Sequence, residues 1–147
     1  FGNILKKNVE NVGFASRYDG QEFVVMIDKL GKDETLGILD KVKEELRKLK
    51  GQSGITFCGG EPLLQAKACL EIAKFCKEEL GWNVWSFTGL IFEQLPQEGP
   101  VHDFICELDA LIDGPFILSK RDLSLKFRGS SNQRILHLKN GEIQSIE

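Results

Sequence analysis

A chain of 147 residues is long enough for one domain with a substantial buried core. Hydrophobic residues make up 41% of it and charged residues 28%, which is ordinary for a soluble globular protein. The net charge of −3, with interleaved signs, argues against a nucleic-acid-binding surface. No apolar run approaches the length of a membrane span, and no signal peptide is visible. We expect one domain over residues 1–147, with neither nucleic acid nor membrane as a partner.

Strand and helix patterns alternate along the chain. Apolar runs rich in β-branched and aromatic residues predict strands at 23–27, 54–57, 83–88 and 110–112. Apolar residues at helical spacing predict helices at 33–50, 63–80 and, much shorter, 101–108. Two further strands, 134–138 and 143–146, flank Asn140-Gly141, which is a strong hairpin signal. Such alternation predicts an α/β fold with a mostly parallel sheet and right-handed crossovers.

The segment Cys58-Gly59-Gly60-Glu61-Pro62 follows the expected buried strand at 54–57. Its two glycines permit positive φ and a close approach by a ligand, because neither carries a Cβ. The acid can pair with a ligand ammonium group, and the proline suits the first turn of a helix. Ligands of open α/β folds bind at this edge of the sheet. A Gly-Gly turn before a helix is also ordinary chain punctuation, so the pattern alone leaves both interpretations open.

Four segments along the chain carry a resemblance to a known family. They are Gly-Gly-Glu-Pro-Leu-Leu (59–64), Trp-Ser-Phe-Thr-Gly (85–89), Leu-Ile-Asp-Gly-Pro-Phe (111–116) and Phe-Arg-Gly-Ser-Ser-Asn-Gln-Arg (127–134). Together they resemble the activating proteins of anaerobic ribonucleotide reductase, within the radical S-adenosylmethionine (SAM) superfamily. The resemblance covers roughly residues 33–138. The segments at 1–6 and 12–17 also resemble the family's N-terminal segments.

The resemblance implies a partial open (βα) barrel and a set of cofactor-binding residues. Gly59, Gly60, Glu61 and Pro62 match the segment that contacts the amino group of SAM in relatives. Further matches follow strand ends or belong to the C-terminal signature, namely Thr88, Gly89, Asp113, Arg128, Ser130 and Asn132. From the residues alone, Asp113 at a strand end can equally be explained as the cap of a turn or helix. The signature arginine is equally well explained as a plain surface cation.

The resemblance also implies the reaction and its partners. In such proteins a reduced 4Fe–4S cluster donates an electron to SAM, and the resulting radical chemistry leaves a glycyl radical on the partner enzyme. The partner would be the large subunit of an anaerobic ribonucleotide reductase or another glycyl-radical enzyme, with a separate one-electron donor. Unclustered cysteines favour a reducing, cytoplasmic location. No catalytic side chain is identified by the sequence.

The cysteines depart from the family pattern. Relatives ligate the cluster through a Cys-x3-Cys-x2-Cys loop after the first strand, whereas this chain has cysteines only at 58, 69, 76 and 106. Positions 69 and 76 share the apolar stripe of one helix, so we expect the cysteine side chains there, and the one at 106, to be buried and to serve only in core packing. Either the natural protein carries a longer segment between Arg17 and Asp33, or the loop is deleted. In the second case the chain is a cluster-free binding subunit for a glycyl-radical enzyme. No metal ligands are assigned.

Overall fold

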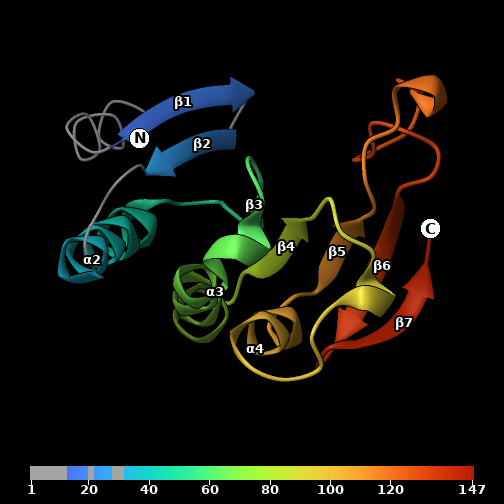
Figure 1. Ribbon diagram of the computed structural model, residues 1–147. Coiled ribbons are helices and arrows are strands. Elements are labelled where there is room, and N and C mark those ends of the chain that lie inside the picture. Colours follow the sequence, from blue (N-terminus) through green and yellow to red (C-terminus); the bar gives the residue numbers. More distant parts are fainter. Residues whose placement is uncertain (1–12, 20–21, 28–31) are drawn as a thin grey trace. The chain divides into compact units, whose positions relative to one another are not determined.

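Figure 1 shows the protein as a computed structural model, which describes residues 13–19, 22–27 and 32–147. The chain divides into two compact units, residues 1–52 and 53–147. The prediction of one domain over the whole chain stays a prediction. Among the described residues, no helix is both long and apolar enough to cross a bilayer.

The first unit contains an antiparallel hairpin and one long helix. Strands β1 (Gly13–Asp19) and β2 (Glu22–Ile27) pair with each other, and α2 (Lys32–Lys48) follows. The strand predicted at 23–27 and the helix predicted at 33–50 are confirmed. Strand β1 was not predicted, because its short apolar alternation is interrupted by Ser16 and Arg17. The family-like opening at 1–6 lies outside the described residues.

The second unit is built on a mixed five-stranded sheet in the order β3-β4-β5-β6-β7. Its strands are β3 (Gly54–Phe57), β4 (Asn83–Phe87), β5 (Ala110–Asp113), β6 (Arg134–Lys139) and β7 (Glu142–Ile146). The β3–β4 and β4–β5 pairs are parallel, whereas β5–β6 and β6–β7 are antiparallel. With the β1–β2 hairpin, antiparallel pairings outnumber parallel ones among the described strands. The prediction of a mostly parallel sheet is therefore wrong.

Two observations explain this departure. Between β5 and β6 the chain forms no crossover helix, only the three-residue η3, and β6 pairs with β5 in the antiparallel sense. The predicted hairpin then adds β7, and it is confirmed by positive φ at both turn residues, 51° at Asn140 and 80° at Gly141. Strand β3 lies at the sheet's edge and is half-exposed, not buried as predicted.

Helices of the second unit connect the strands. The helix predicted at 63–80 is divided into a 3-10 turn η1 (Pro62–Gln65) and α3 (Ala66–Leu80), since the backbone of Gln65, with φ −113° and ψ 26°, departs from α-helical geometry. Gly81 ends α3 in the left-handed conformation with φ 66°, so the helix ends at the residue where the prediction over 63–80 ends it. The remaining helical segments are short; they are η2 (Phe92–Gln94), α4 (Pro100–Cys106) and η3 (Leu118–Lys120).

The core of the second unit fixes the strand ends that carry the predicted site. Val84 and Ser86 of β4 are fully buried on one face, and the Phe57 ring meets the buried Phe104 ring of α4 edge-on at 5.2 Å. On the other face, Trp85 and Phe87 pack against a buried cluster of Ala110, Ile112 and Ile135. Each buried aliphatic side chain contributes about 1.5–3 kcal/mol. The carboxyl ends of β3, β4 and β5 are therefore held side by side at one edge of the sheet.

Candidate functional site

The turn after β3 brings Glu61 back over its own backbone. Gly59 and Gly60 have φ of 81° and 50°, a conformation that costs a residue with a Cβ about 1–2 kcal/mol. Glu61 then caps η1, because its Oε1 accepts a hydrogen bond of 3.1 Å from the amide of Leu63. Pro62 occupies the first turn of η1, as the sequence predicts. The two glycines thus aim the carboxylate at the edge of the sheet.

The same carboxylate joins the β3 and β4 loops. Thr88, which is 4% exposed, donates its hydroxyl to Glu61 Oε1 at 2.9 Å, and the amide of Gly89 donates to Oε2 at 2.8 Å. Thr88 Oγ1 also accepts from the amide of Leu90 at 3.1 Å. A carboxylate has about four acceptor positions, of which protein donors fill two on Oε1 and one on Oε2. Glu61 Oε2 therefore keeps acceptor capacity for one ligand donor.

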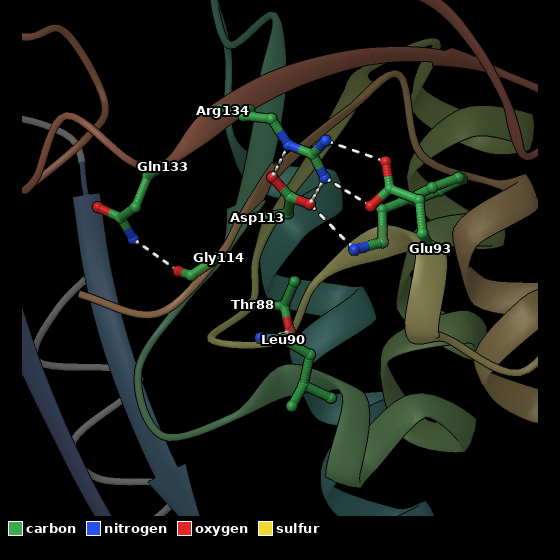
Figure 2. Close-up of polar contacts among 8 residues, drawn as sticks. Thr88, Leu90, Glu93, Asp113, Gly114, Gln133 and Arg134 are labelled. Carbon is green, nitrogen blue, oxygen red and sulfur yellow. Dashed lines mark hydrogen bonds and ion pairs between the residues drawn. The ribbon is translucent and has the colours of Figure 1, made fainter. Parts of the chain in front are cut away.

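The loops after β4 and β5 are also joined. The amide of Gly114 donates to the carbonyl of Leu90 at 2.8 Å. Gly114 in turn accepts from the side chain of Gln133 at 3.0 Å, a contact drawn in Figure 2. Its φ of 94° and the nearby carbonyl of Asn132 make this position suited to glycine. The four sequence motifs that carry the family resemblance therefore meet along one sheet edge.

Asp113 lies at this edge but its carboxylate is engaged by the protein. It is 1% exposed and accepts from Arg134 Nε at 2.9 Å, from Arg134 Nη2, and from the amide of Phe92 at 3.0 Å. Arg134 lies between Asp113 and the exposed Glu93, whose two oxygens it binds at 2.9 and 2.8 Å (Figure 2). The hydrogen bonds from Arg134 lower the pKa of Glu93 to about 2, and those to Asp113 raise the pKa of the guanidinium. Asp113 thus anchors an ion-pair network that joins the end of β5, the start of β6 and η2.

The signature segment 128–134 mainly holds the loop after β5. Gln133 Oε1 accepts from the amides of Gly129 and Ser130, at 2.8 and 3.2 Å. The buried hydroxyl of Ser130 accepts from the amide of Ile117 at 3.2 Å. Asn132 Nδ2 donates to the carbonyl of Pro115 at 2.8 Å. Ser130 Oγ and Asn132 Nδ2 therefore hold this loop in the described structure.

Two buried side-chain atoms in this segment have no hydrogen-bond partner among the described residues. They are Arg128 Nε and Asn132 Oδ1. One is a donor and the other an acceptor, and most such buried atoms in proteins are satisfied. The Arg128 guanidinium also has no ion-pair partner within the described part of the chain.

The four cysteines occupy separate places in the second unit. Cys58 is exposed after β3, Cys76 is fully buried in α3, and Cys69 and Cys106 are half-buried. Burial raises the pKa of the Cys69 thiol to about 11 and that of Cys76 to about 12. The buried packing predicted for Cys76 is confirmed, whereas Cys69 and Cys106 are more open than predicted. Cys69 Sγ lies 3.6 Å from the carbonyl of Pro62, and Cys106 Sγ lies 3.5 Å from His102 Nε2.

Comparison with known proteins gives the family. A family model described as a 4Fe–4S single cluster domain matches residues 24–136. The anaerobic ribonucleoside-triphosphate reductase-activating protein of Escherichia coli K12 is 32% identical over 115 residues, covering 74% of this chain and 72% of that protein. This chain belongs to the family of anaerobic ribonucleoside-triphosphate reductase-activating proteins.

Other members of the family match over shorter stretches. The activating protein of Haemophilus influenzae is 35% identical over 89 residues, which cover 58% of this chain and 56% of that protein. That of Vibrio cholerae is 30% identical over 100 residues, 65% of this chain and 63% of its own length. The chain thus spans between about half and three quarters of the relatives it matches. No solved structure matches it.

The cysteines of this family member do not fit a 4Fe–4S cluster. Thiolates ligate a 4Fe–4S cluster from a compact loop, whereas here Cys58 follows β3, Cys106 lies in α4, and Cys69 and Cys76 both lie in α3. These two cysteines are also about 10 Å apart along one helix, at about 1.5 Å of rise per residue. Among the described residues, no group of three or more Cys, His, Asp or Glu side chains could hold a metal ion. The family's cluster therefore has no ligand set in this part of the chain.

The residues that complete the edge were missed by sequence reasoning. Glu93 and Leu90 lie in an ordinary-looking loop, and their roles depend on contacts with residues more than twenty positions away. Arg134 stands within the quoted signature, yet its pairing with Asp113 was not foreseen. The β-sheet register offered a signal, since the two residues are direct partners across β5 and β6. That register could not be assigned without the antiparallel direction of β6.

Proposed function

We propose that this protein is an activating protein of an anaerobic ribonucleotide reductase and binds SAM at the carboxyl edge of β3, β4 and β5. The observation that carries the proposal is Glu61, whose partly filled carboxylate bridges the β3 and β4 loops. A ligand ammonium group suits its remaining acceptor position. We further propose that the sheet belongs to a radical-SAM-like partial barrel, which the parallel β3–β4–β5 segment supports.

Each predicted site residue has a role in this proposal. Gly59 and Gly60 form the turn with positive φ, and Gly60 leaves space for a ligand, since a Cβ there would have no neighbour within 4 Å. Thr88 and Gly89 orient the Glu61 carboxylate, and Pro62 fixes the start of η1. Asp113, through its ion pair, holds the β5 loop beside them.

The signature residues form the second part of the proposed site. Arg128 and Asn132 each carry a buried atom that has no partner in the part of the chain the structure describes, and a bound group with both donor and acceptor atoms would offer partners after a small loop adjustment. Ser130 keeps the loop in shape through Ile117. We assign Arg128 and Asn132 to ligand binding and Ser130 to positioning.

When bound, SAM supplies the sulfonium group whose reductive cleavage starts radical chemistry in this superfamily. The proposed product is a glycyl radical on the reductase polypeptide. The cluster that would deliver the electron has no ligand set among the four cysteines. This observation favours a second candidate function, a cluster-free subunit that binds SAM and the reductase without activating it.

One experiment separates the two functions. The chain is mixed anaerobically with the reductase, SAM and a one-electron reductant, and the glycyl radical is measured by electron paramagnetic resonance. A radical that requires this chain supports the activating function. A complex with the reductase but no radical supports the binding subunit. Absence of both the radical and the complex contradicts the two functions together.

A further inference from the structure

The loop between β5 and β6 carries an unusual concentration of exposed apolar side chains. It projects beyond these strands as the orange segment of Figure 1. Phe116 is 54% exposed, Leu118 73%, Leu123 81% and Phe127 55%. Large apolar groups scattered singly over a surface need no explanation, but a contiguous patch marks an interaction site.

Contacts with residues 129–131 gather these side chains. The Phe116 ring lies against Gly129, where an added Cβ would come within 3.0 Å of it. Ser130 Oγ accepts from the amide of Ile117, next to Leu118, and Gly129 accepts from the amide of Asp122, next to Leu123. Phe127 is two residues before Gly129 in the chain. All four residues therefore belong to stretches of the loop that contact or adjoin one short segment of backbone, and each exposes its apolar side chain.

The loop is held in a defined conformation by its own hydrogen bonds and packing. Ser131 donates its amide to the carbonyl of Lys120 at 2.8 Å, and Arg121 forms a bridge with Ser130. Phe127 has a φ of 55°, which is unfavourable for a bulky residue, and its ring lies 5.3 Å from that of Trp85 in β4. A surface held in one shape loses little entropy when a partner binds.

The same loop is strongly basic in a chain that is acidic overall. Between residues 114 and 128 there are four cations, Lys120, Arg121, Lys126 and Arg128. The single carboxylate there, Asp122, accepts from the amide and the hydroxyl of Ser124 at 2.9 and 2.6 Å. None of the four cations has an ion-pair partner in the described ranges. The loop thus has a charge of +3, against −3 for the whole chain.

We propose that this 114–128 surface binds an acidic polypeptide segment of the reductase that also carries apolar side chains. The inference rests on the proposed function, and adds the surface and the chemistry of the partner. Cations around apolar anchors would steer such a segment and fix its register. A phosphate backbone would leave the two exposed leucines without a partner. The loop also lacks the long amphipathic helix that is one common means of binding a lipid surface, since its helical part has three residues.

The test measures the dissociation constant of the reductase complex for two double variants. Leu118→Asp/Leu123→Asp should weaken binding about tenfold or more, since buried apolar anchors dominate interface energies. Lys120→Glu/Lys126→Glu should also weaken it and flatten its dependence on salt. Matched controls are Ile146→Asp, at a side chain 54% exposed on β7, and Lys139→Glu, at an exposed residue of β6. Both controls should leave the dissociation constant unchanged.

Each contrary outcome identifies what fails. If the wild-type chain does not bind the reductase, both the proposed partner and the proposed role of the 114–128 surface are wrong. If the wild type binds and both double variants bind equally well, the surface is wrong while the proposed function stands. If the leucine variant lowers the melting temperature by several degrees, the chain itself covers these side chains and the inference is overturned. Tight binding to anionic phospholipid vesicles that the lysine variant abolishes would also overturn it, in favour of a membrane surface.

Discussion

Replacing Glu61 with alanine removes three protein hydrogen bonds and one acceptor for the proposed ligand. The buried Thr88 hydroxyl loses its acceptor, which costs about 1–3 kcal/mol. The amide of Leu63 loses its cap, typically worth about 1 kcal/mol. Water replaces the carboxylate at the exposed Gly89 amide with little cost. The free energy of unfolding should therefore fall by about 3 kcal/mol, and Tm by about 6–12 °C.

The affinity for SAM should fall further than stability explains. A hydrogen bond between an ammonium group and a carboxylate contributes about 1.5–3 kcal/mol, which corresponds to about 10–100-fold in the dissociation constant. Glu61→Gln keeps Oε1 as an acceptor for Thr88 but lacks the charge, so it should lose SAM affinity with a smaller fall in Tm. Titration calorimetry with SAM and thermal unfolding measure the two effects separately.

A destabilised control tests whether the loss of affinity is specific. Ile105→Val removes one buried methylene from α4, far along the chain from the site, at a cost of about 0.5–1.5 kcal/mol. It should lower Tm and leave SAM affinity unchanged. The reasoning is refuted if Glu61→Ala keeps the wild-type affinity, or if Ile105→Val loses as much affinity as Glu61→Ala.

Three further predictions concern charge, burial and thiol reactivity. Arg134 lowers the pKa of Glu93 from 4.5 to about 2, so this carboxylate stabilises the fold above pH 4.5 and its contribution disappears as the pH falls towards 2. The difference in the free energy of urea unfolding between the wild type and Glu93→Ala should shrink over that pH range. A constant difference would argue against the ion pair. Arg134→Ala leaves the buried Asp113 unpaired, so it should lower the free energy of unfolding by about 3–5 kcal/mol, more than Glu93→Ala does. Equal losses of unfolding free energy in denaturant titrations would contradict this. Cys58 should react with a thiol reagent in the folded protein much faster than Cys76, and peptide mapping that finds similar rates would show that the burial is wrong.

Local sequence signals predicted individual elements well. The hairpin turn at Asn140-Gly141 and the end of α3 at Gly81 depend on backbone conformations that neighbouring residues determine. The division of 63–80 into η1 and α3 was missed because Glu61 caps the short turn through its side chain. Helical spacing placed Cys69 and Cys76 on one face, but spacing alone does not say how fully a neighbouring element covers each position.

Sheet direction and the ion-pair network could not be predicted from local patterns. The antiparallel pairing of β6 with β5 forms across a long loop, so periodicity within either strand says nothing of it. Asp113 was expected near a cofactor, and only the tertiary structure shows that Arg134 occupies its carboxylate. The family resemblance assigned Glu61, Thr88 and Gly89 to one site; in the structure Glu61 accepts hydrogen bonds from Thr88 and Gly89, and their binding of a cofactor stays a prediction.

The measurement that tests the central proposal most directly is a titration of the isotopically labelled chain with SAM, followed by backbone amide NMR. The account predicts saturable shifts that are largest for the amides of Gly59, Gly60 and Gly89, around the Glu61 carboxylate. Saturable shifts confined to residues remote from this edge would move the site elsewhere. The absence of any saturable shift would contradict SAM binding by this chain.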